Sequence, residues 1–378
     1  MTTAHLDAQA IPPRGLEEFR ATKYFPALDG LRCFSIAAVI WHHCTPRQLE
    51  GVAGRGHLGV RLFFCISGLL ITLLLLRERR ISGTVNLSRF WIRRCLRIFP
   101  LYYLVLLFFT LFALRLPLTS AIRSHFFESL PYYASHTSNW FVNYGVPHSV
   151  LFGFAWSLST EEQFYLFLPL LVKKLTGRTT LGLALLALII VDQLTERHFL
   201  GCVFPRHSRV EIIVTSFMAS IGFGALLAVA LDDARGFRIL RPLLANKFSA
   251  PMLFALVMIW LIRPPQLFVL FEAALALFVA ACAMGGDFRF VRAFALRPLC
   301  HVGRVSYGMY LFHVPVIGAL RHTLPFIAER AAVLFPIALI VTIGIATLSH
   351  RTFEAFFLAM RPGSRKPIPA GFPRRGRT

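Results

Sequence analysis

An arginine and a histidine share one face of the first apolar segment of the chain. Arg32 and His43 are 11 residues apart, a separation that falls about 20° from three full helical turns and about 16 Å along the helix axis. Ionisable side chains inside apolar segments are unfavourable and usually functional, and a neutral imidazole can take a proton from a hydroxyl. The spacing predicts a proton-transfer group, His43, on the same helix face as a cation, Arg32, about three turns away. The alternative is a polar pair that only packs helices.

Two later apolar segments carry further groups that could act with this histidine. Glu161 and Glu162 are adjacent, so their side chains cannot point in the same direction. At least one of them is expected to cap the helix or to lie at the membrane interface. Glu161 is predicted at a depth comparable to that of His43, where a carboxylate could orient the imidazole and raise its basicity. Tyr310 and His313 are three residues apart and share a face, although a single such histidine is more often structural.

Three arginines lie together between the second and third apolar segments. Arg93 and Arg97 are one helical turn apart and Arg94 flanks them. Because Arg binds phosphate oxygens through paired hydrogen bonds, the sharper interpretation is a site for a phosphorylated cytosolic ligand. The alternative is an ordinary basic loop, 77–97, on the cytosolic side. In the preceding segment, Ser67 and the glycine after it would allow close helix approach.

The composition indicates which elements must position these groups. Hydrophobic residues make up 56% and charged residues 15% of the 378 residues, against roughly 25% charged in soluble domains. This balance excludes a disordered chain, a fibrous protein and a secreted disulfide scaffold, and predicts an all-α polytopic membrane protein. About ten apolar segments are long enough to span a membrane, namely 31–49, 57–76, 98–116, 151–172, 180–195, 211–231, 248–263, 266–284, 302–320 and 331–349.

The distribution of positive charge predicts the topology. The net charge is +22, and 27 of the 40 Lys and Arg residues fall in the segments assigned to the inside against 10 outside. This bias predicts that both termini lie inside, and it explains the charge without a nucleic-acid partner. We expect a flexible cytoplasmic arm (1–24), a transmembrane domain (25–352) and a basic cytoplasmic tail (353–378), with the longest connection, 117–150, at the outer surface or re-entering it.

Taken together, the motifs resemble the acyltransferase 3 family of integral-membrane O-acyltransferases. The resemblance covers residues 25 to about 320 and lies in five segments, which are LDGLR followed by His43, FFCISGLLI, FWIRRCLRIFPLYY, WSLSTEEQFYLFLP and VSYGMYLFHVPV. The family's functional positions fall on Arg32 with His43, on Arg93, Arg94 and Arg97, on Glu161, and on His313.

The resemblance implies ten core helices and transfer of acetyl, or another short acyl group, from cytosolic acyl-CoA to a hydroxyl of a surface or exported glycan. His43 is the expected general base, with direct attack favoured over an acyl-His intermediate, and Glu161 would hold its tautomer. The other expected roles are CoA binding by Arg32, Ser67, Arg93, Arg94 and Arg97, and support by Asp29, Tyr310 and His313.

No metal is expected for this chemistry. The expected setting is a bacterial inner membrane, with lipid, a hydroxyl-bearing glycan and polysaccharide assembly proteins as partners. The main alternative is a polytopic transporter of glycans or lipid-linked sugars, which also has about ten spans and intramembrane His and Glu. A weaker alternative is a membrane sensor or scaffold, for which substitutions of ionisable residues within the spans would affect folding alone.

Overall fold

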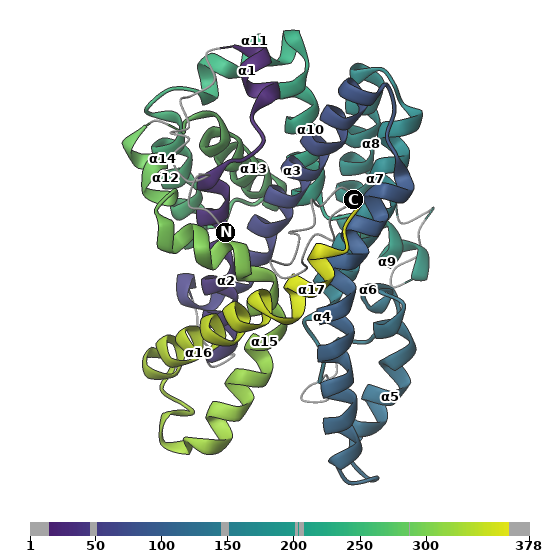
Figure 1. The fold of residues 1–378 in the computed structure, drawn as a ribbon, viewed down its shortest axis with the longest axis vertical. Helices are drawn as coiled ribbons and strands as arrows, with labels where there is room; N and C mark the ends of the chain where they lie inside the picture. The colour runs from purple at the N-terminus through teal and green to yellow at the C-terminus, as the bar shows by residue number, and fades with distance from the viewer. Residues whose placement is uncertain are drawn as a thin grey trace, which may run out of the picture.

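The computed structural model describes residues 15–45, 51–144, 151–200, 203, 208–286 and 288–362, and every regular element within these ranges is a helix (Figure 1). The α-helices are Leu16–Ala21 (α1), Pro26–Cys44 (α2), Gly59–Ser82 (α3), Leu87–Arg115 (α4), Ala121–Ala134 (α5), Ser138–Phe141 (α6), Ala155–Lys174 (α7), Arg178–Glu196 (α8), Arg209–Thr215 (α9), Ala219–Asp232 (α10), Ala234–Leu244 (α11), Ser249–Ile262 (α12), Phe268–Met284 (α13), Arg289–Phe294 (α14), Arg297–Thr323 (α15), Ala331–Arg351 (α16) and Phe353–Ala359 (α17). Two short 3-10 helices are Gly51–Leu58 (η1) and Pro325–Ile327 (η2).

The predicted all-α membrane-type architecture is confirmed in its coarse form, since each of the ten apolar segments contains a helix. In the described part of the chain, four helices are long and apolar enough to cross a membrane, and two bent pairs raise this number to six. The four are Gly54–Ser82, Leu87–Arg115, Arg178–Glu196 and Ala331–Ala359. The count of ten crossings and the inside location of both termini stay predictions.

Helix α4 begins earlier than the sequence analysis predicted. The side chain of Asn86 accepts a hydrogen bond of 2.9 Å from the backbone N–H of Arg89, which is the geometry of a helix N-cap. The cap starts the helix at Leu87, so the three arginines at 93, 94 and 97 lie on a helix and not in a loop. This is a correction to the predicted basic loop at 77–97.

The segments assigned to the arm, the longest connection and the tail also contain helices. The arm carries α1, whose Phe19 is buried, and the tail begins with α17. The connection 117–150 contains α5 and α6, and α5 packs along α4 through a hydrogen bond of 2.8 Å from the Tyr102 hydroxyl to the Tyr133 carbonyl. Residues 1–14, 145–150 and 363–378 lie outside the described ranges.

Helices α2 and α15 approach each other closely at glycines. A β-carbon at Gly303 of α15 would lie 1.8 Å from the carbonyl oxygen of Asp29 in α2. A β-carbon at Gly30 would lie 1.8 Å from the carbonyl oxygen of Phe294, the last residue of α14. Glycine is therefore required at both contacts, which fix where α2 touches α15 and α14.

A buried aspartate ties several elements together at the end of the bundle that carries α1 and α11. Asp232, 2% exposed, pairs with Arg80 and with Arg178 at 2.9 Å, and Arg20 lies at 3.6 Å. We expect Asp232→Asn to lower the free energy of unfolding by about 3 kcal/mol, because three guanidinium groups lose their counter-charge. Thermal unfolding in detergent measures this loss.

The neighbouring Asp233 offers a matched control. It is a half-buried N-cap of α11, accepting from the N–H groups of Arg235 and Gly236, and Asn caps helices as well as Asp does. Asp233→Asn should therefore unfold like the wild type. Equal losses in the two variants would contradict the role assigned to Asp232.

A buried histidine between α5 and α6 predicts acid sensitivity. The His136 ring stacks on Phe99 at 5.1 Å, and neither ring nitrogen has a hydrogen-bond partner among the described residues. Burial lowers the pKa of His136 to about 4, against about 6.5 in an unfolded chain. As the pH falls from about 6.5 to about 4, the unfolded state takes up a proton that the folded state does not, so stability falls by up to about 3 kcal/mol.

The variant His136→Asn should flatten this dependence. Asn tolerates the positive φ of 53° at this position better than other residues, and it does not titrate in this range. The measurement is the thermal unfolding midpoint between pH 7 and pH 4, with His322→Asn at an exposed site as the control. An unchanged pH slope in His136→Asn would assign the acid sensitivity to another group.

Candidate active site

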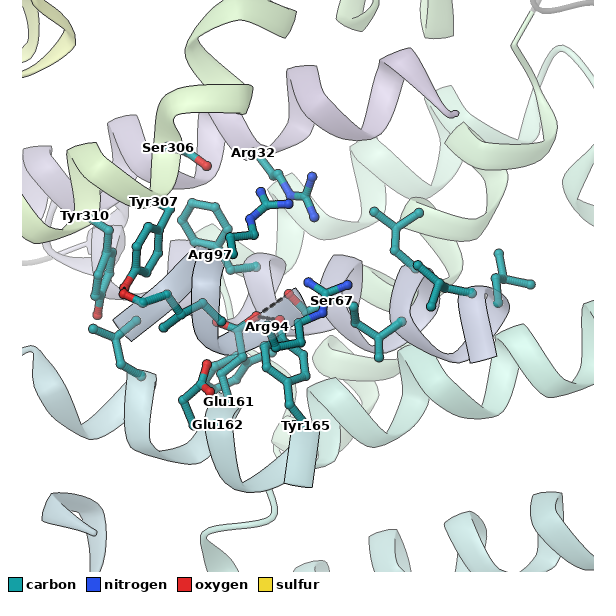
Figure 2. Close-up of a pocket in the computed structure, with 18 of the residues that line it drawn as sticks. Arg32, Ser67, Arg94, Arg97, Glu161, Glu162, Tyr165, Ser306, Tyr307 and Tyr310 are labelled. Atoms are coloured by element: carbon teal, nitrogen blue, oxygen red, sulfur yellow. Dashed lines mark hydrogen bonds between the residues drawn. The ribbon is translucent and has the colours of Figure 1, made fainter. Parts of the chain in front are cut away.

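A cavity of about 340 Å³ lies between α2, α3, α4, α7 and α15. Figure 2 shows its polar side chains converging on one space, and the labelled lining residues are Arg32, Ser67, Arg94, Arg97, Glu161, Glu162, Tyr165, Ser306, Tyr307 and Tyr310. Along α3 the lining runs from Val60 to Arg77, which is about 26 Å of helix. The cavity is therefore elongated along α3.

The two ends of the cavity differ in chemistry. Arg77, near the end of α3, lies on the same side of the bundle as the start of α4, which contributes Arg94 and Arg97. The opposite end is lined by Val60, Ser157 and Tyr310. A ligand with an anionic head and a long, less polar arm fits this polarity, because guanidinium groups bind phosphate oxygens.

The middle of the cavity is organised by Glu161. Its carboxylate accepts hydrogen bonds from the Ser67 and Tyr165 hydroxyls (Figure 2), and the guanidinium of Arg94 lies 5.2 Å from the centre of the Tyr165 ring. Ser67 therefore lines the cavity, and its role in CoA binding stays a prediction. Tyr165 was not among the predicted site residues, although its spacing of four from Glu161 indicated a shared helix face.

At the far end, Tyr310 separates the cavity from a pair of histidines. The Tyr310 and Ser157 hydroxyl oxygens are 2.5 Å apart, and the Tyr310 hydroxyl also donates to the Phe154 carbonyl at 3.2 Å. Behind it, the ring of His313 lies 5.4 Å from that of Tyr310. The ring of His43 lies 4.8 Å from that of His313.

The environment of His313 defines its tautomer. Its Nδ1 lies 2.7 Å from the Tyr310 carbonyl oxygen, and since a carbonyl only accepts, Nδ1 carries the hydrogen. The side chain is fully buried, and its Nε2 has no hydrogen-bond partner among the described residues. Nε2 therefore presents a lone pair in a water-poor site next to the His43 ring.

The backbone around His43 is held from α15 as well. A guanidinium nitrogen of Arg321 donates to the carbonyl oxygens of His43 at 3.1 Å and of Cys44 at 3.4 Å. These carbonyls belong to the last turn of α2, where intrahelical donors are lacking. One helix thus supplies both the ring against His43 and the cap of the turn that carries it.

Not every predicted partner is brought together. Glu161 was expected beside His43; its hydrogen bonds are with Ser67 and Tyr165, whereas His313 lies against His43. Arg32 lines the cavity and its Nη1 donates to Asp29 at 3.0 Å. Four of the five predicted donor-site residues, Arg32, Ser67, Arg94 and Arg97, thus share one cavity with Glu161, while the histidines lie behind its end wall.

The three clustered arginines have different positions. Arg94 and Arg97 line the cavity, but Arg93 donates from Nε and Nη2 to the carbonyl oxygen of Pro362, at 3.1 and 2.9 Å. Both Arg93 and Arg94 are within one turn of Arg97 on α4, so the split comes from the contact of Arg93 with Pro362 and not from the helical repeat.

Comparison with known proteins decides the family. The sequence matches the acyltransferase domain of the acyltransferase 3 family over residues 25–351. The chain belongs to this family. The recognition made from the five motifs is therefore confirmed. No solved structure matches the chain.

The curated relatives of this acyltransferase 3 chain are named as O-acetyltransferases. O-acetyltransferase OatA of Staphylococcus aureus (strain NCTC 8325 / PS 47) is 28% identical over 371 residues, which cover 90% of this chain and 58% of OatA. SACOL0978 of S. aureus (strain COL) is named as an O-acetyltransferase by inference. It is 27% identical over 363 residues, which cover 91% of this chain and 59% of SACOL0978. The chain thus spans less than two thirds of these relatives.

Proposed function

We propose that this acyltransferase 3 protein is an O-acyltransferase that moves an acyl group, most simply acetyl, from acyl-CoA to a hydroxyl of a glycan. The observation that carries the proposal is the cavity, whose lining runs from its arginines past Glu161 to Tyr310, with the His43–His313 pair behind Tyr310. Family membership supports acyl transfer, and the names of the relatives favour acetyl as the group and oxygen as its acceptor.

The donor is proposed to enter from the cytosol. With the N-terminus inside, the end of the cavity that holds Arg77, Arg94 and Arg97 faces the cytosol, where acyl-CoA is made. The CoA phosphates would bind these guanidinium groups. The pantetheine arm would then follow α3, and the thioester would reach the wall formed by Ser157 and Tyr310.

The reaction then takes place at the histidine pair. His43 accepts the proton of the acceptor hydroxyl, the oxygen attacks the thioester carbonyl carbon, and the new C–O bond replaces the C–S bond. The proton passes from His43 to the departing CoA thiolate. The ring of His313, whose centroid lies 4.8 Å from that of His43, would orient the His43 imidazole, a role predicted from the sequence for Glu161.

The proposed setting is the inner membrane of a bacterium, with the acceptor approaching from the outer face and polysaccharide assembly proteins as partners. The test compares surface glycans by mass spectrometry in the wild type, a deletion strain and the deletion strain complemented with the gene. Loss of one acyl mass from an otherwise intact glycan, restored by the gene, is the expected result.

Two other outcomes would overturn parts of the proposal. Unchanged glycans in the deletion strain would exclude a surface glycan as the acceptor. Disappearance of whole glycans, with no change in their decoration, would favour the transporter alternative. Release of free CoA from acetyl-CoA by purified protein given the acceptor would, in contrast, exclude a transporter without catalytic activity.

A further inference from the structure

The segment that follows α16 docks onto the start of α4. Helix α17 lies beside α4 in Figure 1, where the C-terminal end of the described chain reaches the upper part of that helix. Two N–H groups of the Arg93 guanidinium hold the carbonyl oxygen of Pro362, at 3.1 and 2.9 Å. The contact fixes the residue before it, Arg361, next to the arginine cluster of α4.

This docking concentrates positive charge beside the arginines of α4 that line the cavity. Arg361 is half-buried, and burial together with the charges of Arg94 and Arg93 lowers the pKa of its guanidinium, opposed by Glu354. Arg361 also acts electrostatically on Arg97. Like charges gathered in a partly buried site repel each other, so the arrangement is one that a multiply charged anion would stabilise.

We propose that Arg361, with Arg93, forms a subsite for the 3′-phosphate of CoA at the mouth of the donor cavity. The proposal rests on the function proposed above and extends it to Arg361, a residue beyond the family match, which ends at 351. Along CoA, the order from the thiol is pantetheine, diphosphate and then the 3′-phosphorylated ribose.

That order assigns each phosphate to a pair of arginines. With pantetheine in the cavity, the diphosphate lies at the lining residues Arg94 and Arg97. The 3′-phosphate, which is farther from the thiol, then lies outside them, where Arg361 and Arg93 are. Arg93 uses Nε and Nη2 for Pro362, which leaves the N–H groups of Nη1 for a phosphate oxygen.

The test measures binding of CoA and of 3′-dephospho-CoA to the purified full-length protein in detergent by calorimetry. The wild type should bind CoA about tenfold more tightly than dephospho-CoA, the size expected for one charge-assisted contact. Arg361→Ala should lose this preference and bind the two ligands equally. Arg361→Lys should restore part of it, because the charge returns without the paired geometry.

Arg351→Ala is the matched control, since it removes one exposed positive charge from the same part of the chain and should keep the preference. Thermal unfolding of each variant shows that the fold is retained. A preference that survives in Arg361→Ala would overturn the subsite while leaving the proposed function intact. Failure of the wild type to bind CoA or acetyl-CoA at all would instead overturn the proposed donor, and with it the subsite.

Discussion

Replacing His43 by Ala is expected to reduce acyl transfer by at least about 100-fold, while the protein still inserts and folds. General-base catalysis contributes about 10² to 10⁴ to a rate, and His43 is the imidazole at the end of α2, held by Arg321 and facing His313. The measurement is the initial rate of acetyl transfer from labelled acetyl-CoA to the endogenous acceptor in membrane vesicles, normalised to the amount of protein.

His301→Ala is the control for this experiment. Like His313, His301 lies on α15, but it is about three helical turns from His313 and on a different face of the helix. Its Nε2 lies 3.1 Å from the Thr347 hydroxyl oxygen. It should retain most of the activity. Full turnover in His43→Ala would remove the general base from the proposed mechanism, and equal losses in both variants would indicate a common effect on folding.

Gly303→Ala is expected to have an effect of similar size without touching an ionisable group. Its new β-carbon would lie 1.8 Å from the Asp29 carbonyl oxygen, so α15 must move from α2 by a distance on the order of 1 Å. Because His313 lies on α15 and His43 on α2, this movement separates the two rings. A misplacement of about 1 Å can lower a rate about 100-fold, and the unfolding temperature should fall as well.

The same helix supplies the matched control. Gly318 has no atom within 4 Å of the place where a β-carbon would be built, so Gly318→Ala changes the same residue type without a clash. It should keep full activity and unfold at the same or a slightly higher temperature, since Ala favours helix over Gly. Full activity in Gly303→Ala would show that the contact of α2 with α15 does not position the reacting groups.

Local spacing explains what could be predicted about the site. Arg32 and His43 lie on one helix, so the helical repeat alone relates their positions, and the structure places Arg32 in the cavity and His43 beyond its end. The contacts of Glu161 with Ser67 and of His43 with His313 join helices that are far apart in the chain. They depend on how the helices pack, which one sequence does not contain in any local pattern.

The helix boundaries show the same difference between what a local pattern predicts and what depends on packing. Apolar segments were located correctly because hydropathy is a local property, but the start of α4 was missed although Asn86 was a readable N-cap signal. Helix α5 was missed because it lies along α4 as a 14-residue element, shorter than a span. Its stability comes from packing, as in the hydrogen bond from Tyr102 to the Tyr133 carbonyl.

The repeated contacts between α2 and α15 also determine which part of the protein can move. The two helices meet at Gly303 near one end and at the His43–Arg321 contact near the other, so they behave as one rigid body. The opposite wall of the cavity, α4 with α7, touches α15 through hydroxyl contacts such as Tyr307 to the Ile98 carbonyl. If the donor is CoA, as proposed, we expect it to enter by displacing the α4–α7 wall, so that the imidazoles of His43 and His313 would keep their geometry while the donor enters and leaves.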